Sequence, residues 1–443
     1  MDVVIAMQQG GPGLTSGWDQ LVGLSGVASG HLAGIQGSLA PLLATDAALE
    51  RELGSLLVIA LCAALIPLLV GLLRLKVAEV VLLLGAGILF GPQGLGLIEI
   101  DAGIELLNEL GLGLLFFLAG YELESRAIRG LSGKLAGAGW ISSLALACII
   151  TYGLYAVGFV KDFIGIAIAL TTTAMGTLLP VIRDRGLLDT PFGTFFMGGG
   201  AAGEFGPILA IALLLGSKSL LITVIVLAIF ALVTWLTYRT PGRFATGRMA
   251  ELFERGHHTS SQTAVRWTVV LMLFLLTLAA VFGFDAVLGA FVAGVILRKY
   301  SPPSATNRLA PKIEALGFGF FIPLFFIVSG ANLDVDSIIA NPARLVVFFV
   351  LLMAVRGLPQ YVLYRRALPD NRERWQFSFY IATALPLLVA ITTIEVRNGH
   401  MLPENAAALV GAGALSVLVF PLVGDRINRR RAAPDAERIT EPA

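Results

Sequence analysis

The chain has 443 residues, of which 56% are hydrophobic and 14% are charged, with a formal net charge of +1 and a mean hydropathy of +0.84. A soluble globular domain carries roughly 25% charged residues, so this composition excludes an ordinary soluble fold and predicts an integral membrane protein. The two cysteines, Cys62 and Cys148, lie in apolar runs and predict neither a disulfide framework nor a metal site.

Apolar runs long enough to cross a bilayer recur along almost the whole chain. A span of about 20 apolar residues crosses a hydrocarbon core ~30 Å thick. The runs cover residues 53–73, 77–91, 106–122, 134–157, 162–182, 191–215, 218–238, 264–283, 285–298, 313–331, 343–364, 374–394 and 404–424. We therefore predict an all-α integral membrane protein with about thirteen transmembrane helices, give or take one.

The basic residues of the loops predict the orientation of the chain. If the N-terminus is outside, most of the 31 Lys and Arg fall in inner loops and in the C-terminal tail. This distribution is the positive-inside pattern, and it places the C-terminus in the cytoplasm of a multi-pass protein of the cell membrane. The outer segments hold Arg51, Lys161, Lys218, Arg344 and Arg397.

Three regions follow from this topology. Residues 1–52 are predicted to form an external tail without a signal peptide, because Asp2 follows Met1 and the apolar run is short. Residues 53–425 form the transmembrane domain, and residues 426–443 form a short basic cytoplasmic tail.

Two ionisable residues are predicted near the middle of the membrane. Glu204, in the stretch GGGAAGEFGPIL, lies about 20 Å into its span at 1.5 Å per residue, and Arg356 lies at a similar depth in another span. A charged group at that depth costs on the order of 3 kcal/mol, so the opposite signs predict a pair.

The pair has two interpretations. It is either a structural salt bridge that holds two helices in register, or a site where Glu204 alternately binds a proton and a cation. Burial raises the pKa of a carboxylate and a neighbouring arginine lowers it, so such an acid can exchange its proton near neutral pH. An arginine keeps its proton in proteins, and the exchangeable proton is therefore assigned to Glu204.

Two spans carry features that interrupt a helix at mid-depth. One contains Thr171, Thr172 and Thr173, followed by Gly176 and Pro180. The other contains Thr383 and Pro386. Taken alone, either feature is typical of a benign kink, but carbonyls freed by an unwound segment can also coordinate a cation.

The two interrupted spans correspond to one another. When they are aligned 213 residues apart, Thr173 falls on Pro386 and Gly186 falls on Gly399. They are an odd number of spans apart, so they cross the membrane in opposite directions. Inverted repeats of this kind occur in secondary transporters, which bind their substrates where the discontinuous helices cross.

Five motifs in this order resemble those of the monovalent cation:proton antiporters, especially the Kef-like branch. They are VLLLGAGILFGPQGLG (81–96), FFLAGYELE (116–124), LGAFVAGVIL (288–297), FIPLFFIVSGANLD (321–334) and NPARLVV (341–347). The resemblance covers residues 55 to 425. It implies a sodium/proton antiporter fold with a dimerisation domain, a core domain that moves like an elevator, and two crossed discontinuous helices.

The resemblance also assigns roles to residues. It places the ion-binding carboxylate at Glu204, the late basic residue at Arg356, and the unwound segments at Thr171 to Thr173 and Thr383 to Pro386. Relatives usually carry a second polar or acidic residue where this chain has Gly203. With a single carboxylate, we expect electroneutral exchange of one proton per cation, with Gly203 leaving room for the longer side chain or for water.

The sequence therefore predicts antiport of protons against Na⁺ or K⁺, with the cation held by Glu204 and Thr172. No cofactor and no nucleic acid partner is expected, and the family implies a homodimer. A sodium-coupled solute symporter of the same crossed-helix design is the alternative. A channel is disfavoured because the sequence has no selectivity-filter repeat, and an enzyme because the spans have no histidine and no paired acids.

Overall fold

The fold is that of a computed structural model of the whole chain. The structure describes residues 49–72, 78–122, 130–161, 163–214, 262–281, 286–300 and 303–429. The chain divides into two compact units, residues 1–56 and residues 57–443. The functional residues predicted above all belong to the second unit.

The regular elements of the described residues are helices, in agreement with the predicted all-α fold class. An apolar helix, Leu49–Leu72, comes first. It is followed by α2 (Glu79–Phe90), α3 (Ala102–Glu122), α4 (Gly130–Ala156), α5 (Ile164–Ala169), α6 (Met175–Asp184), α7 (Pro191–Leu214), α10 (Thr263–Val281), α11 (Ala286–Tyr300), α12 (Pro303–Leu316), the π-helical η2 (Gly317–Phe321), α13 (Ile322–Ala331), α14 (Val335–Ala340), α15 (Pro342–Leu351), the π-helical η3 (Leu352–Gly357), α16 (Leu358–Leu363), α17 (Asn371–Ala382), α18 (Pro386–Arg397) and α19 (Pro403–Arg429).

Eight helices of the described residues are long and apolar enough to cross a membrane. Two shorter apolar helices, Glu79–Phe90 and Val287–Arg298, match the predicted short second and ninth spans. The predicted span 218–238 lies outside the described residues, as does most of the predicted external tail, so the count of thirteen stays a prediction.

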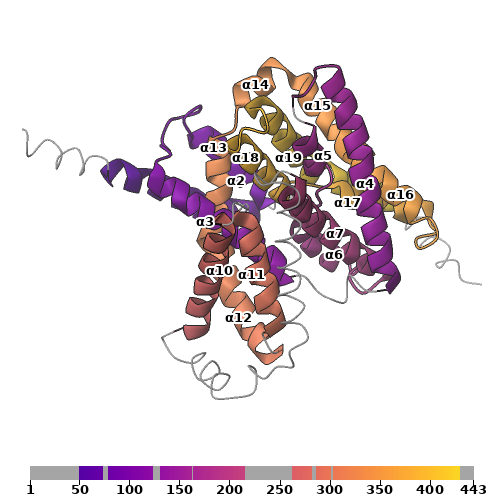
Figure 1. The fold of residues 1–443 in the computed structure, drawn as a ribbon, viewed down its shortest axis with the longest axis horizontal. Coiled ribbons are helices and arrows are strands. Elements are labelled where there is room, and N and C mark those ends of the chain that lie inside the picture. Colours follow the sequence, from indigo (N-terminus) through magenta and orange to yellow (C-terminus); the bar gives the residue numbers. More distant parts are fainter. Residues whose placement is uncertain are drawn as a thin grey trace, which may run out of the picture. The chain divides into compact units, whose positions relative to one another are not determined.

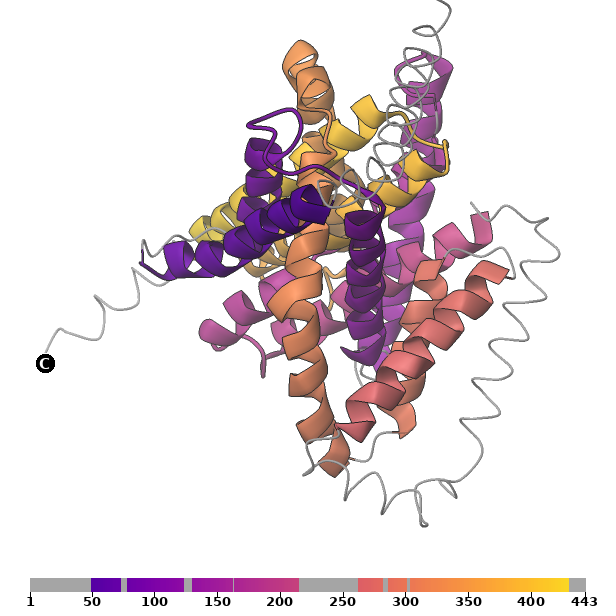
Figure 2. The same ribbon diagram turned by 90° about the vertical axis from the view of Figure 1, so that its left-hand side faces the viewer.

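The helices of the second unit pack in two groups (Figure 1). The first bundle consists of α2, α3, α10, α11, α12, η2 and α13, and the core bundle consists of α4 to α7 and α14 to α19. Contacts of α7 with α11 and of α13 with α18 join the bundles. In Figure 2, α12, η2 and α13 follow one another as one long helix.

Glycines of the family-like motifs hold the first bundle together. A Cβ atom at Gly87 of α2 would lie 1.9 Å from the carbonyl oxygen of Ile327 in α13. A Cβ atom at Gly120 of α3 would lie 2.0 Å from the carbonyl oxygen of Phe291 in α11. Because only glycine lets two helix backbones approach so closely, these motifs encode helix packing.

Two ion pairs join helix ends that are distant in the sequence, and in each pair the predicted topology places both helix ends on the same side of the membrane. Arg397 forms an ion pair with Glu109, and both are predicted outside. Arg185 forms an ion pair with Asp425, and both are predicted inside. Both ion pairs therefore agree with the predicted direction in which these spans cross the membrane.

Two helices are interrupted where the sequence predicted, with residues 170–174 between α5 and α6 and residues 383–385 between α17 and α18. The second halves, α6 and α18, end in the same way, with Gly186 at φ +65° and Gly399 at φ +74°. These left-handed conformations favour glycine and terminate a helix. The equivalence of the two glycines supports the predicted repeat.

Candidate functional site

The two interrupted helices cross and are hydrogen-bonded at the crossing. Three consecutive residues, Thr173, Ala174 and Met175, have backbone N–H groups that form hydrogen bonds outside their own helix. They donate to the carbonyl oxygen of Gly203 at 3.1 Å, the carbonyl oxygen of Thr383 at 2.7 Å and Oε1 of Glu204 at 3.2 Å. These three hydrogen bonds therefore join the start of α6 to α7 and to the second interruption.

Glu204 lies on α7 and reaches the first residue of α6, Met175. The first N–H groups of a helix have no partner within the helix, and the helix dipole adds partial positive charge there. A carboxylate at this position is stabilised by about 0.3–2 kcal/mol. The N-terminus of the half-helix α6 therefore binds the carboxylate of Glu204.

Pro207 leaves one backbone carbonyl of α7 available to the first interruption. In a regular helix, the N–H of residue 207 would donate to the carbonyl of Gly203, but proline has no N–H. The carbonyl oxygen of Gly203 instead accepts the backbone N–H of Thr173. The proline thus frees one carbonyl of α7 for the interrupted helix.

Arg356 lies in η3 and is completely buried. Its Nε donates to Oγ1 of Thr173 at 3.0 Å, and its Nη2 donates to the carbonyl oxygen of Gly199 at 2.8 Å. The predicted direct pair with Glu204 is not formed between these described side chains, because the guanidinium is oriented towards these two oxygens. Arg356 nevertheless lies against the turn of α7 that precedes Glu204.

The expected role of Gly203 is corrected by the structure. A Cβ atom at this position would lie 2.3 Å from Oγ1 of Thr173 and 2.5 Å from Nη2 of Arg356. The missing side chain therefore does not leave room for water or for a longer acid. Its space is filled by the threonine hydroxyl and the guanidinium.

Two further glycines on this face of α7 have the same function. A Cβ atom at Gly200 would lie 2.9 Å from Cγ of Met175, and one at Gly206 would lie 2.2 Å from the ring of Trp140 on α4. The glycine-rich composition of the stretch thus permits α4, α6 and η3 to approach the turns around Glu204.

The three threonines of the first interruption differ in how their hydroxyls are used. Thr171 and Thr172 donate back to the carbonyls of Ile168 and Ala169 at 2.7 and 2.8 Å. The hydroxyl of Thr173 donates to the carbonyl of Ile381 at 2.8 Å and accepts from Arg356. A hydroxyl has one proton and two lone pairs, so Thr171 and Thr172 keep more acceptor capacity for a cation than Thr173 does.

The second interruption is held by a residue that the sequence analysis missed. Pro386 is the first residue of α18, and the Thr383 hydroxyl donates to the carbonyl of Phe379 at 3.0 Å. The hydroxyl of Ser416 in α19 accepts from the N–H of Ala384 and contacts its carbonyl, both at 3.0 Å. A lone serine in an apolar span gives no sequence signal for this role.

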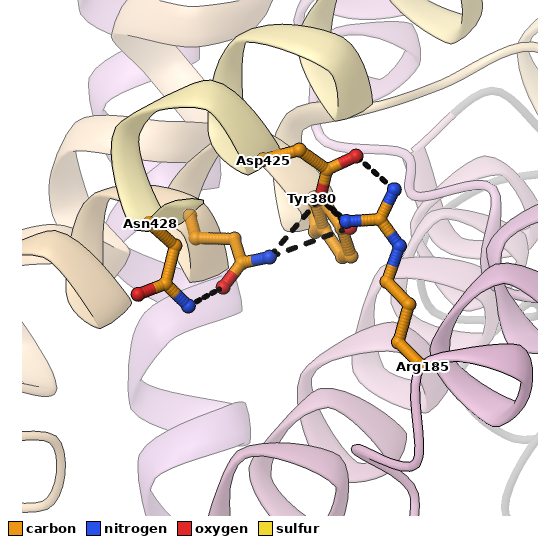
Figure 3. A network of polar contacts seen from close by, with 5 residues as sticks. Arg185, Tyr380, Asp425 and Asn428 are labelled. Atoms are coloured by element: carbon orange, nitrogen blue, oxygen red, sulfur yellow. Dashed lines mark hydrogen bonds and ion pairs between the residues drawn. The ribbon is translucent and has the colours of Figure 1, made fainter. Parts of the chain in front are cut away.

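A second polar cluster, also missed, lies at the predicted inner end of the core bundle (Figure 3). The buried carboxylate of Asp425 accepts from Tyr380 at 2.5 Å and from Gln376 at 3.1 Å, and it forms an ion pair with Arg185. Asn428 donates to Gln376 at 2.7 Å. The cluster joins the end of α6 to α17 and α19, and so links both interrupted helices.

This arrangement of crossed helices can be compared with known proteins. A model of the family "Sodium/hydrogen exchanger, transmembrane" matches residues 47–427. The chain belongs to this family. The family is one of transporters and not of enzymes, and the predicted family is confirmed.

The relatives and a solved structure agree with that assignment. YjbQ of Bacillus subtilis, a protein named for Na⁺/H⁺ antiport, is 24% identical over 425 residues, covering 88% of this chain and 65% of its own. The glutathione-regulated potassium-efflux system protein KefC of Escherichia coli is 25% identical over 372 residues, covering 82% and 59%. The chain thus spans less than two thirds of the length of these curated relatives.

The fold is similar to that of the sodium proton antiporter MjNhaP1 from Methanocaldococcus jannaschii. The TM-score is 0.59 at 16% sequence identity, covering 86% of this chain and 98% of that chain. The predicted fold class, with two crossed discontinuous helices, is confirmed.

Proposed function

We propose that the protein exchanges protons for a monovalent cation, Na⁺ or K⁺, across the cell membrane. The observation that carries this proposal is the position of Glu204, whose carboxylate lies at the N-terminus of the half-helix α6 beside the crossing of two interrupted helices. The names of YjbQ and KefC, which refer to Na⁺/H⁺ antiport and potassium efflux, support it.

Proton and cation compete for the same carboxylate in this mechanism. When Glu204 is ionised, its charge attracts a cation, and the threonine oxygens of Thr171 and Thr172 and nearby carbonyls complete the shell. When Glu204 is protonated, that attraction is lost and the cation leaves. Because one site serves both ions in turn, coupling needs no second site.

The stoichiometry follows from the charges of the site. Arg356 bonds neutral oxygens and keeps its proton, so it is a fixed positive charge. Glu204 then contributes the single exchangeable proton, and one proton is exchanged per cation. The cycle is electroneutral.

The division into two bundles supports movement of the core bundle against the first bundle. The threonines, Glu204 and Arg356 all lie in the core bundle, and contacts of α7 with α11 and of α13 with α18 join it to the first bundle. We place the N-terminus outside and the C-terminus in the cytoplasm, and we assign the first bundle to dimerisation in a homodimer.

The test uses the protein in proteoliposomes that contain a pH-sensitive dye, with Na⁺ or K⁺ gradients and with the membrane potential clamped or free. Glu204→Gln removes the ionisable oxygen at nearly constant volume, so we expect it to abolish proton exchange driven by either cation. Glu109→Gln is the matched control, because Glu109 is an exposed acid paired with Arg397. Persistent exchange in Glu204→Gln would refute the assignment.

A further inference from the structure

Buried polar atoms without protein partners occur on α4 and on the segment from η3 to Tyr364, two parts of the chain that pack against each other. They belong to Ser143, Arg356, Gln360 and Tyr364, which we call the polar track. Oγ of Ser143, Nη1 of Arg356, both amide atoms of Gln360 and the hydroxyl of Tyr364 have no hydrogen-bond partner among the described residues. All four residues are almost completely buried.

The residues of the polar track follow one another along two packed helical segments. Arg356, Gln360 and Tyr364 follow at intervals of four residues, in η3, in α16 and at the residue that ends α16. The contact of Phe159, just beyond the end of α4, with Phe348 of α15 shows that α4 runs antiparallel to this segment. A Cβ atom at Gly139 would lie 2.3 Å from Oε1 of Gln360, so Ser143, one turn further along α4, lies level with Arg356.

The burial of the polar track favours internal water. Residues four apart on a helix have Cβ atoms about 5–6 Å apart, so the side chains of the track are neighbours along their segment. Buried polar groups without protein partners are normally bonded to internal water. The backbone positions of Arg356 and Tyr364 are eight residues, or about 12 Å, apart along this segment.

The polar track connects the site to the predicted inner end of the core bundle. At the site end, the guanidinium of Arg356 lies against Gly203, and the ring of Trp140, one residue after Gly139, lies against Gly206. At the other end, the ring of Tyr364 packs against Phe195 and Phe377, at centroid distances of 5.5 and 4.6 Å. The ring of Tyr364 is completely buried in this structure.

We propose that the polar track holds a chain of internal water molecules and that this chain carries protons between the inner end of the core bundle and the region of Glu204. The function of the chain rests on the proposed proton exchange, but its existence does not. The donors and acceptors of Gln360 connect the two ends of the track, so this side chain is the positioning residue of the middle section.

Radiolytic labelling tests the water chain in the unmodified protein. X-rays produce hydroxyl radicals from bound water, and mass spectrometry locates the side chains that are oxidised. Tyr380 is the matched control, because it is as completely buried as Tyr364 but its hydroxyl is bonded to Asp425. We expect severalfold more oxidation at Tyr364 than at Tyr380, and less of it in Gln360→Leu. Equal protection of the two tyrosines would overturn the proposal.

Transport measurements test the function of the chain. Gln360→Leu and Tyr364→Phe are expected to lower the rate of exchange at saturating cation by about tenfold or more, with little change in apparent cation affinity. Ser329→Ala is the control, because Ser329 on α13 also has a buried hydroxyl without a partner among the described residues but lies in the first bundle.

The outcomes separate this proposal from the assignment of Glu204. An unchanged rate in a Gln360→Leu variant that has lost the Tyr364 labelling would show that the water carries no protons, and would overturn the transport role. Exchange that persists in Glu204→Gln would refute the site assignment, while the labelling of Tyr364 would still decide whether the water chain exists.

Discussion

Gly203→Ala tests the close packing at the crossing of the interrupted helices. The new methyl group would lie 2.3 Å from Oγ1 of Thr173 and 2.5 Å from Nη2 of Arg356, and real Cβ contacts under 3.0 Å are essentially never observed. The methyl must therefore displace the threonine or the guanidinium. Either movement breaks the hydrogen bond between Nε of Arg356 and Thr173.

The expected destabilisation is the net result of three effects. Overpacking costs about 1–3 kcal/mol, and loss of a hydrogen bond to a charged group costs about 1.5–3 kcal/mol. Alanine in place of glycine within a helix returns up to ~1 kcal/mol. The net cost is about 1.5–6 kcal/mol, which corresponds to a Tm lower by roughly 2–6 °C for a chain of this size.

Thermal unfolding of the purified protein in detergent, combined with exchange assays in proteoliposomes, measures this effect. Gly137→Ala on α4 is the control, because nothing lies within 4 Å of its added Cβ atom. We expect Gly203→Ala to unfold earlier and exchange more slowly than Gly137→Ala. If the two variants have the same Tm and the same rate, Arg356 and Thr173 do not occupy the space beside Gly203.

Three further predictions concern the surroundings of the site. Arg356→Ala removes a positive charge near Glu204, so the carboxyl should keep its proton to higher pH and the exchange profile should move up by about one pH unit; an unshifted profile in a folded variant contradicts this. Asp425→Asn weakens the ion pair and the hydrogen bonds of the inner cluster, so it should lower the free energy of unfolding by about 1–2 kcal/mol. Thermal unfolding measures this change, and an unchanged Tm would mean that the cluster contributes no stability. Ser416→Ala leaves the N–H of Ala384 buried without its partner and should cost about 1–3 kcal/mol, measured in the same way, with wild-type stability as the opposing result.

Several features of the site could be predicted from the sequence because they violate local rules. A carboxylate in an apolar span, an arginine in another, and threonines or proline within a span are each unfavourable unless the fold compensates for them. Glu204, Arg356 and both interruptions are features of this kind, and each is visible in the sequence. It could not find Ser416 or the cluster around Asp425, because a single serine or a span-end aspartate violates no rule.

The partners of Arg356 illustrate the limit of such reasoning. Opposite charges at equal depth predicted an ion pair with Glu204, but depth does not fix the direction of a side chain. In the structure, the arginine bonds Thr173 and Gly199, and the glutamate bonds the start of α6. Only the crossing of the helices decides which oxygen lies within hydrogen-bond distance.

The sequence by itself predicted an integral membrane protein, the repeat and an acidic residue at mid-depth, because hydropathy, periodicity and the cost of a buried charge act along the chain. The tertiary structure decided the role of Gly203, the hydrogen-bond partners of Arg356 and the buried polar groups that lack protein partners. These depend on which backbones approach each other, and that approach is set by packing between helices far apart in the sequence.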